Sequence, residues 1–213
     1  DEDFLIFNKP SNYAVHSGTK NDHGLIDILR AVLKDNSLNL CHRLDKGTSG
    51  CLVIAKNQKF LGFFNNQLKQ RKVKKIYHAI VKDFISEEMV IEDSIDTNTK
   101  GSFNKVSINK NGKEAKSILK PLKKLDCSSL IEIEILTGRT HQIRAQCEKI
   151  NKNIANDKKY GCKDFNTRLK HSGIKRLGLH SSEISFLDLD NKINTFVADY
   201  DDQFEKMLSY LNT

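Results

Sequence analysis

Hydrophobic residues recur at helical spacing in four separate stretches of the chain. Between positions 25 and 33 they follow an i, i+3, i+4, i+7, i+8 pattern, which predicts an amphipathic helix. The same kind of spacing predicts helices over 60–68, 143–150 and 204–211. Asp201 and Asp202 precede the last of these, where negative charge stabilises the positive end of a helix.

Other stretches have the patterns of β-strands. Isoleucines at 131, 133 and 135 alternate with glutamates, which predicts a strand with one solvent-exposed face. Apolar runs predict strands over 4–7, 51–55 and 76–81, and in the last of these Tyr77, Ala79 and Val81 share a face. Predicted strands outnumber helices and do not interleave with them regularly. The pattern therefore favours an α+β fold with a mixed, mostly antiparallel central sheet over a doubly wound α/β fold.

The composition is that of a folded chain that can bury a core. Of its 213 residues, 38% are hydrophobic. No Pro/Ser-rich linker or internal repeat divides the sequence, so we expect one domain over residues 1–213 and a monomer. No apolar run approaches the ~20 residues that span a bilayer, and no export leader is visible, so the expected location is the cytoplasm, with no membrane partner.

The cysteines and histidines do not have the spacing of a metal site. The five cysteines are widely separated and form no C-x-x-C pair, and the seven histidines are scattered. We expect free thiols, no metal and no cofactor.

Positive charge is concentrated in two segments. The net charge is +8, but residues 183–213 carry seven acidic residues and two lysines, which leaves +13 on residues 1–182. Much of this excess lies in 66–75, with five basic residues and no acidic one, and in 157–176, with seven basic residues against two acidic ones. The distribution is typical of a protein that binds a polyanion such as RNA, although a solvated lysine-rich face is an equal alternative.

Two clusters carry candidate chemistry. The loop at 42–50 places Asp45 between basic residues and two glycines, directly before the predicted strand at 51–55, so its carboxylate is either a rigidly aimed catalytic group or part of an ordinary charged turn. At 137–144, Arg139 and Arg144 either clamp a phosphate, pair with Asp45, or form a plain surface pair. Tyr77, next to Lys74 and Lys75, is either a base-stacking platform or an ordinary sheet aromatic.

Taken together, the ordered motifs resemble those of the RluA-type family of RNA pseudouridine synthases. The resemblance is carried by H-R-L-D-K-G-T-S-G at 42–50 and L-T-G-R-T-H-Q-I-R at 136–144, and by shorter motifs: Asn8-Lys9-Pro10, Val15-His16, Lys75-Ile76-Tyr77-His78-Ala79, Gly112-Lys113-Glu114-Ala115, Asn156-Asp157, Tyr160-Gly161 and Leu179-His180. It implies a pseudouridine-synthase domain that needs no cofactor.

The resemblance also assigns roles to single residues. Asp45 matches the catalytic aspartate, and Arg144 the arginine that ion-pairs with the aspartate. Tyr77 matches the tyrosine that stacks on the target base and is a candidate for assisting proton removal. Arg43 matches a residue that occupies the space left by a flipped nucleotide, and Leu179 an apolar residue of the uracil pocket. The further candidates for RNA contact are His42, Arg139, Lys74 and Lys75.

Within the family, 14–18 and 160–180 are most similar to the synthase C branch, which acts on large-subunit (23S) ribosomal RNA. The alternatives are a tRNA substrate and a non-catalytic RNA-binding or ribosome-assembly factor. The chain departs from the family pattern at Gln146, Ser181 and Leu187-Asp188, which affects expected RNA contacts more than chemistry. It opens directly before the first strand, so we expect the N-terminal S4-like RNA-binding domain of that branch to be absent.

Overall fold

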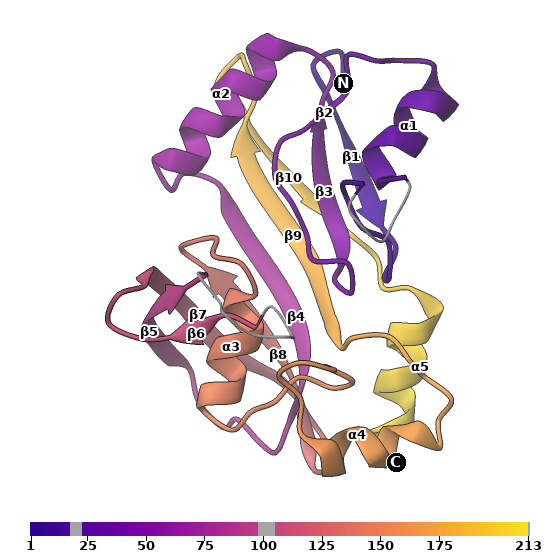
Figure 1. The fold of residues 1–213 in the computed structure, drawn as a ribbon, viewed down its shortest axis with the longest axis vertical. Helices are drawn as coiled ribbons and strands as arrows, with labels where there is room; N and C mark the ends of the chain where they lie inside the picture. Colours follow the sequence, from indigo (N-terminus) through magenta and orange to yellow (C-terminus); the bar gives the residue numbers. More distant parts are fainter. Residues whose placement is uncertain (18–22, 98–104, 213) are drawn as a thin grey trace. The chain divides into compact units, whose positions relative to one another are not determined.

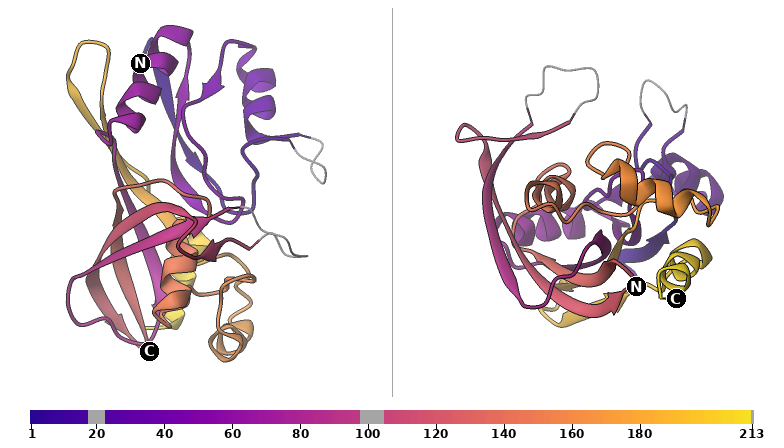
Figure 2. Two further views of the ribbon diagram at one scale, coloured as in Figure 1. Left: turned by 60° about the vertical axis from the view of Figure 1, so that its left-hand side comes forward. Right: turned by 90° about the horizontal axis from the view of Figure 1, so that it is seen from below.

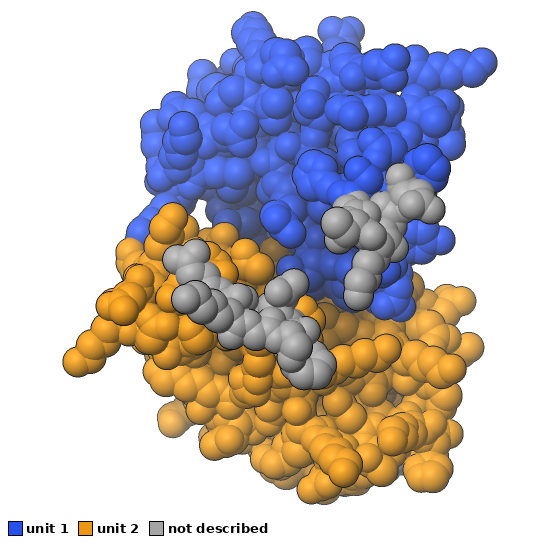
Figure 3. Space-filling view, viewed as in Figure 1, with its two compact units in different colours: residues 1–75, 181–199 blue, residues 76–180, 200–213 orange. Residues whose placement is uncertain are grey.

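The computed structural model describes residues 1–17, 23–97 and 105–212, in which ten strands and five helices form. The chain divides into two compact units, coloured separately in Figure 3: unit 1 comprises residues 1–75 and 181–199, and unit 2 comprises residues 76–180 and 200–213. Gly18, part of the motif at 14–18, lies outside the described residues. The prediction of one domain stays a prediction.

Unit 1 is built on strand β3 (Ser49–Ala55), whose seven residues are all buried. It pairs antiparallel with β1 (Phe4–Lys9) and β2 (Asn39–Leu40), and β9 (Leu179–Leu187) pairs antiparallel with β10 (Ile193–Val197). Residues 179 and 180 of β9 belong to unit 2. Helices α1 (Leu25–Leu33) and α2 (Gln58–Lys69) complete the unit (Figure 1).

Phenylalanines from distant parts of the sequence form the core of unit 1. Phe4 of β1 stacks on Phe60 of α2 with ring centroids 4.8 Å apart, and Phe64 packs edge-on against Phe186 of β9 at 5.1 Å. Phe60 and Phe64 are four residues apart and therefore lie on one face of α2. Asn57 caps this helix, because its side-chain oxygen accepts a hydrogen bond from the backbone N–H of Phe60 at 2.9 Å.

Unit 2 is an antiparallel sheet with three helices. Neighbouring strands pair in the order β4, β8, β7, β5, β6, and each pair is antiparallel. The strands are β4 (Lys74–Lys82), β5 (Met89–Asp96), β6 (Ser107–Ile108), β7 (Lys113–Leu125) and β8 (Ser128–Ile135), and the helices are α3 (Gln142–Lys149), α4 (Lys163–Lys170) and α5 (Asp202–Tyr210). Residues 74 and 75 of β4 belong to unit 1.

The helices of unit 2 cover its sheet in two places. Helix α3 lies against β5, while α4 and α5 share a core and are seen near one another in the right view of Figure 2. Phe165 and Leu169 of α4 share a core with Phe204 and Met207 of α5 and with Ile80 of β4. Buried apolar residues thus fix the positions of helices whose own polar faces point to solvent.

The structure confirms the α+β fold with a mostly antiparallel sheet. Every pairing described above is antiparallel, and the helices predicted at 25–33, 60–68, 143–150 and 204–211 are α1, α2, α3 and α5, with ends shifted by at most two residues. The predicted strands are β1, β3, β4 and β8. None of the described helices has the length and apolar character needed to cross a membrane.

Candidate active site

Asp45 lies in unit 1 on the loop that connects β2 to β3. The backbone N–H of Thr48 donates to the carbonyl of Asp45 at 3.1 Å, which closes a tight turn over Lys46 and Gly47. Asp45 itself is half-buried, while Thr48 and the start of β3 are buried. The carboxylate therefore stands on a short turn whose far end is fixed in the most buried strand of the unit.

A buried lysine holds this loop from the other side. Lys9, at the end of β1, is 0% exposed, and its ε-ammonium donates to the carbonyls of Pro10 and Tyr13, each at 2.9 Å, and of Lys46 at 3.3 Å. The hydroxyl of Ser11 donates to the carbonyl of Gly47 at 2.8 Å. Lys9 and Ser11 thus bind the main-chain carbonyls of the two central residues of the turn, a role that the sequence pattern did not reveal.

His42 is turned into unit 1. Its Nε2 accepts a hydrogen bond from the backbone N–H of Val53 at 3.0 Å, and its ring stacks over Phe64. Burial, together with the positive charge of Lys75, lowers the pKa of His42 to about 4, so the ring is neutral at pH 7. The structure shows the contact of His42 with β3, and its direct contact with RNA stays a prediction.

Gly50, which ends the H-R-L-D-K-G-T-S-G motif, has a backbone φ of +106°. A Cβ atom at this position would stand 2.1 Å from the carbonyl oxygen of Ser181 in β9. Only glycine allows both this conformation and this approach of two backbones. The glycine thus permits the close packing of β3 on β9 just after the Asp45 turn.

Two of the other predicted RNA contacts in unit 1 are on its surface. Arg43 is exposed, and so is Lys74, which forms an ion pair with Glu183 at 3.4 Å. Lys75 is half-buried and contributes to the low pKa of His42. These positions suit contacts with an external polyanion.

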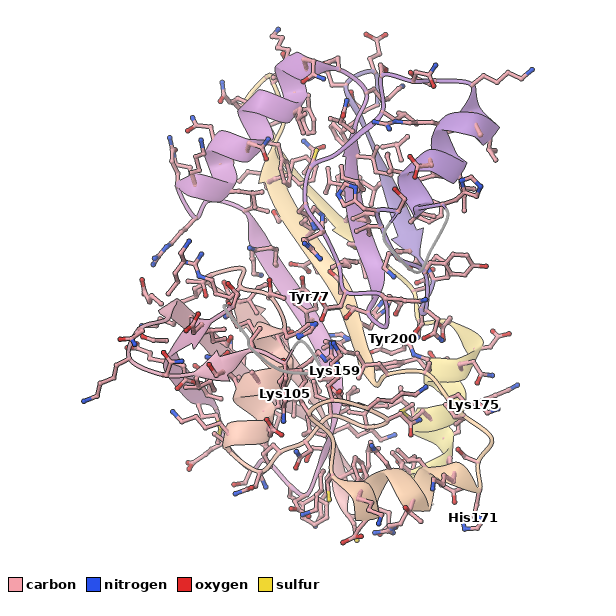
Figure 4. All side chains as sticks on the ribbon, viewed as in Figure 1. Tyr77, Lys105, Lys159, His171, Lys175 and Tyr200 are labelled. Atoms are coloured by element: carbon pink, nitrogen blue, oxygen red, sulfur yellow. The ribbon has the colours of Figure 1, made fainter. Side chains whose placement is uncertain are left out.

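Tyr77 and Leu179 lie in unit 2. Tyr77, labelled in Figure 4, is 7% exposed on β4 opposite Ile133 of β8. Ala79, which the sequence predicted to share a face of the strand with Tyr77, is fully buried. Leu179 is also buried, and its carbonyl accepts a hydrogen bond from Arg176 at 3.1 Å.

Arg144, on α3, forms a two-point ion pair with Asp157. Its Nε donates to Oδ2 at 2.7 Å and its NH2 donates to Oδ1 at 2.8 Å. Burial opposes ionisation of Asp157, but the guanidinium and two backbone N–H groups together hold the pKa of its carboxyl below the ordinary value. The sequence did not predict this partner of Arg144: it named Asp45 as the expected partner and gave Asp157 no role.

Tyr160 fixes a second side of the same arginine. The ring is buried, and its centroid lies 5.0 Å from Cζ of Arg144, within range of a cation–π interaction. Its hydroxyl accepts a hydrogen bond from the backbone N–H of Val106 at 2.7 Å and is hydrogen-bonded to Nδ1 of His141 at 2.9 Å. Arg144 is thus held by a carboxylate at its edge and an aromatic ring at its face.

Buried glutamines organise the rest of the T-G-R-T-H-Q-I-R motif. Gln142 accepts hydrogen bonds from the hydroxyl of Thr137 at 2.8 Å and the backbone N–H of Arg139 at 3.0 Å. The Nε of Arg139 donates to the carbonyl of Glu114 at 2.9 Å. Gln146 bonds to Ser117 of β7 at 2.7 Å, so this departure from the family pattern is a structural link in unit 2.

The predicted site residues therefore fall into two groups. Unit 1 contains Asp45 and its loop. Unit 2 contains Tyr77, Leu179 and Arg144. Backbone hydrogen bonds connect the strand of Tyr77 to the residue before Leu179: the N–H of Ala155 donates to the carbonyl of Ile80 at 2.9 Å, and the N–H of Gly178 donates to the carbonyl of Ala155 at 2.8 Å. Among the described residues, no group of three or more histidine, cysteine or acidic side chains is arranged to hold a metal ion.

Comparison with known proteins shows what this arrangement is similar to. A family model described as RNA pseudouridylate synthase matches residues 3–149. The chain is 38% identical to the ribosomal large subunit pseudouridine synthase C of Buchnera aphidicola subsp. Baizongia pistaciae, over 99% of this chain and 69% of the relative. It is 37% identical to the protein of the same name from Buchnera aphidicola subsp. Schizaphis graminum, over 100% of this chain and 68% of the relative.

A solved structure agrees with the sequence relatives. Human RNA pseudouridylate synthase domain containing 1 superposes with a TM-score of 0.78 at 26% identity, over 94% of this chain and 81% of that one. The family match includes the Asp45 loop, Tyr77 and Arg144. On this agreement of sequence and fold, the chain belongs to the RNA pseudouridylate synthase family.

Proposed function

We propose that this chain isomerises uridine to pseudouridine in large-subunit ribosomal RNA, with Asp45 as its catalytic carboxylate. Its family and the names of its relatives at 37–38% identity support the reaction and the substrate. The observation that supports Asp45 as the catalytic residue is the rigidity of its loop. The buried side chain of Lys9 binds the carbonyl of Lys46, and the hydroxyl of Ser11 binds the carbonyl of Gly47. We also propose that it acts in the cytoplasm and as a monomer.

The reaction explains why one carboxylate suffices. The N1–C1′ bond of uridine breaks, the uracil turns and its C5 bonds to C1′. The proton that C5 then loses is balanced by one that N1 gains, so no group is gained or lost and no electrons are transferred. Breaking the glycosidic bond places positive character on the sugar, which a carboxylate stabilises or captures. Attack of Asp45 on C1′ and removal of a proton at C2′ are both compatible with this role.

The remaining residues act on the nucleotide or on the aspartate. In the proposal, the target base leaves its stack at a cost of a few kcal/mol, and stacking on Tyr77 offsets much of that cost at about 1–3 kcal/mol per base. Arg43 fills the space that the base leaves, and Leu179 lines the uracil pocket. Arg144 keeps Asp45 ionised and oriented, and basic segments 66–75 and 157–176, together with Arg139, bind the RNA backbone.

The test is Asp45→Asn, which preserves shape and removes the charge. We expect pseudouridine formation in ribosomal RNA, located by chemical mapping, to fall at least ~10³-fold. RNA affinity should change less than about threefold, since the loss is one of transition-state stabilisation. Asp190→Asn, the same change at an exposed position of unit 1, is the control and should keep full activity. Substantial turnover by the Asp45 variant would overturn the assignment, and modification of transfer RNA instead would overturn the substrate.

A further inference from the structure

Asp157 is more deeply buried than the arginine it binds. Its side chain is 0% exposed against 11% for Arg144. Besides the two bonds from Arg144, its Oδ1 accepts hydrogen bonds from the backbone N–H groups of Lys159 at 2.8 Å and Tyr160 at 3.0 Å. The main chain therefore fixes the orientation of this carboxylate together with the arginine.

The segment that carries Asp157 is anchored to the strand of Tyr77. The N–H of Ala155 donates to the carbonyl of Ile80 at 2.9 Å, and the N–H of Lys82 donates to the carbonyl of Asn153 at 2.9 Å. On its other side, Asn166 of α4 donates to the carbonyl of Asp157 at 3.1 Å. Asp157 thus provides a rigid connection between β4 and the guanidinium on α3.

Only part of the guanidinium is used in this connection. The fork with Asp157 engages Nε and NH2, and the ring of Tyr160 lies against the face of the group. A planar guanidinium held at one edge and one face can keep only one orientation. The direction in which NH1 points is then set by Asp157 and Tyr160.

We propose that Asp157 is a positioning residue for the isomerisation: it touches no reacting atom and acts by holding Arg144 in the orientation that serves Asp45. The proposal rests on the proposed function of Asp45 and Arg144. Without the carboxylate, the long arginine side chain gains alternative rotamers, and catalysis is sensitive to displacements of about 1 Å. The effect should therefore appear in kcat and not in RNA binding.

The first experiment compares Asp157→Asn with Asp93→Asn. Asp93 is a matched control because its side chain is only 2% exposed and it pairs with Lys149 of the same helix, α3. We expect Asp157→Asn to lower kcat on a ribosomal RNA fragment at least ~30-fold, with KM and RNA affinity changed less than about threefold. Asp93→Asn should lose comparable thermal stability and keep kcat within about threefold. Equal kcat losses in the two variants would mean that Asp157 is merely structural.

The second experiment is a double-mutant cycle with Arg144→Met. If Asp157 acts through Arg144 alone, adding Asp157→Asn to Arg144→Met lowers kcat no further. This pair also leaves no unpaired buried charge, so it keeps the comparison possible if Asp157→Asn alone does not fold. A further drop of tenfold or more in the double variant would overturn the proposal.

The outcomes separate this inference from the proposed function. Full activity of Asp157→Asn, with Asp45→Asn inactive and Arg144→Met impaired, would overturn the role of Asp157 alone. Full activity of Arg144→Met would overturn the role of the arginine, and with it this inference. Activity of Asp45→Asn would overturn the proposed function itself.

Discussion

Lys9 and Lys46 are joined by a hydrogen bond from the ε-ammonium of the first to the main-chain carbonyl of the second, 3.3 Å apart. The bond links β1 to the residue after Asp45, across 37 positions of sequence. A charged side chain is costly to bury unless its donors are hydrogen-bonded. Lys9 is 0% exposed, and the carbonyls of three residues accept hydrogen bonds from its ε-ammonium. The geometry of the Asp45 turn therefore depends on a residue that does not itself carry the chemistry.

Lys9→Met should destabilise the protein more than it slows the reaction. The change removes the charged donor that three main-chain carbonyls share, which costs about 1–3 kcal/mol in the free energy of unfolding. Lys9 binds the main chain of the loop at Lys46 and has no part in the proposed chemistry, so the kcat of the folded variant should stay well above that of Asp45→Asn. Urea denaturation measures the loss in the free energy of unfolding, and a separate activity assay at low temperature, where the variant is folded, measures kcat. Lys59→Met, an exposed position on α2, is the control, and an equal effect of the two changes would contradict this role.

Gly50→Ala should be strongly destabilising, because a methyl group would collide with the carbonyl oxygen of Ser181 and the φ of +106° disfavours any side chain. We expect a loss of more than about 2 kcal/mol in the free energy of unfolding. Gly62→Ala is the matched control: it lies within α2, and apart from its chain neighbours and the backbone of its own helix no atom stands within 4 Å of an added Cβ, so the change should stabilise by about 0.5–1 kcal/mol. Thermal unfolding of both variants gives the sign directly, and similar shifts would refute the explanation.

The elements that the sequence predicted are those with large apolar residues at regular spacing. Strand β7 was missed because the residues it buries include Ala115 and Ser117, which carry little hydrophobic signal. Pro121 adds to this, since it precedes a register shift in the pairing with β8, and proline is unusual inside a strand. Helix α4 was missed because only Phe165 and Leu169 mark its buried face.

The sequence named the candidate reactive residues, which stay predictions, but it did not predict the contacts that support them. Asp45, Tyr77 and Arg144 stand in short motifs that the sequence displays. The bonds from Lys9 to Lys46 and from Arg144 to Asp157 join distant or irregular segments, and no local periodicity records them. Lys9 and Asp157 also show why charged residues in a sequence are poor guides to exposure: each is buried because several hydrogen bonds satisfy it.

His42 should make stability depend on pH in the acid range. Its pKa is about 4 in the folded protein, through burial and then the charge of Lys75, against an ordinary value of 6.5. Between these values the unfolded chain binds a proton that the folded one does not, so stability falls as pH drops from 6.5 to 4. The contribution is about 3 kcal/mol at most. His42→Gln keeps an acceptor for Val53 without titrating, so its free energy of unfolding should fall less over this range; identical pH profiles would rule the effect out.

Lys163 and Lys170 should contribute to RNA affinity through charge alone. They are exposed, seven residues apart in α4, and therefore on the same face two turns apart, and neither forms an ion pair with a described residue. Each phosphate contact adds about 0.7–0.9 to the slope of log affinity against log salt, so Lys163→Gln and Lys170→Gln should each reduce that slope by up to about one. The kcat at saturating RNA should stay unchanged, because neither side chain belongs to the proposed catalytic group.

Lys192→Gln, which removes an exposed lysine from the acidic segment 183–213, is the control and should leave the slope as it is. Binding titrations at several salt concentrations decide the matter, and a slope that no α4 variant alters would remove this helix from the RNA-binding surface.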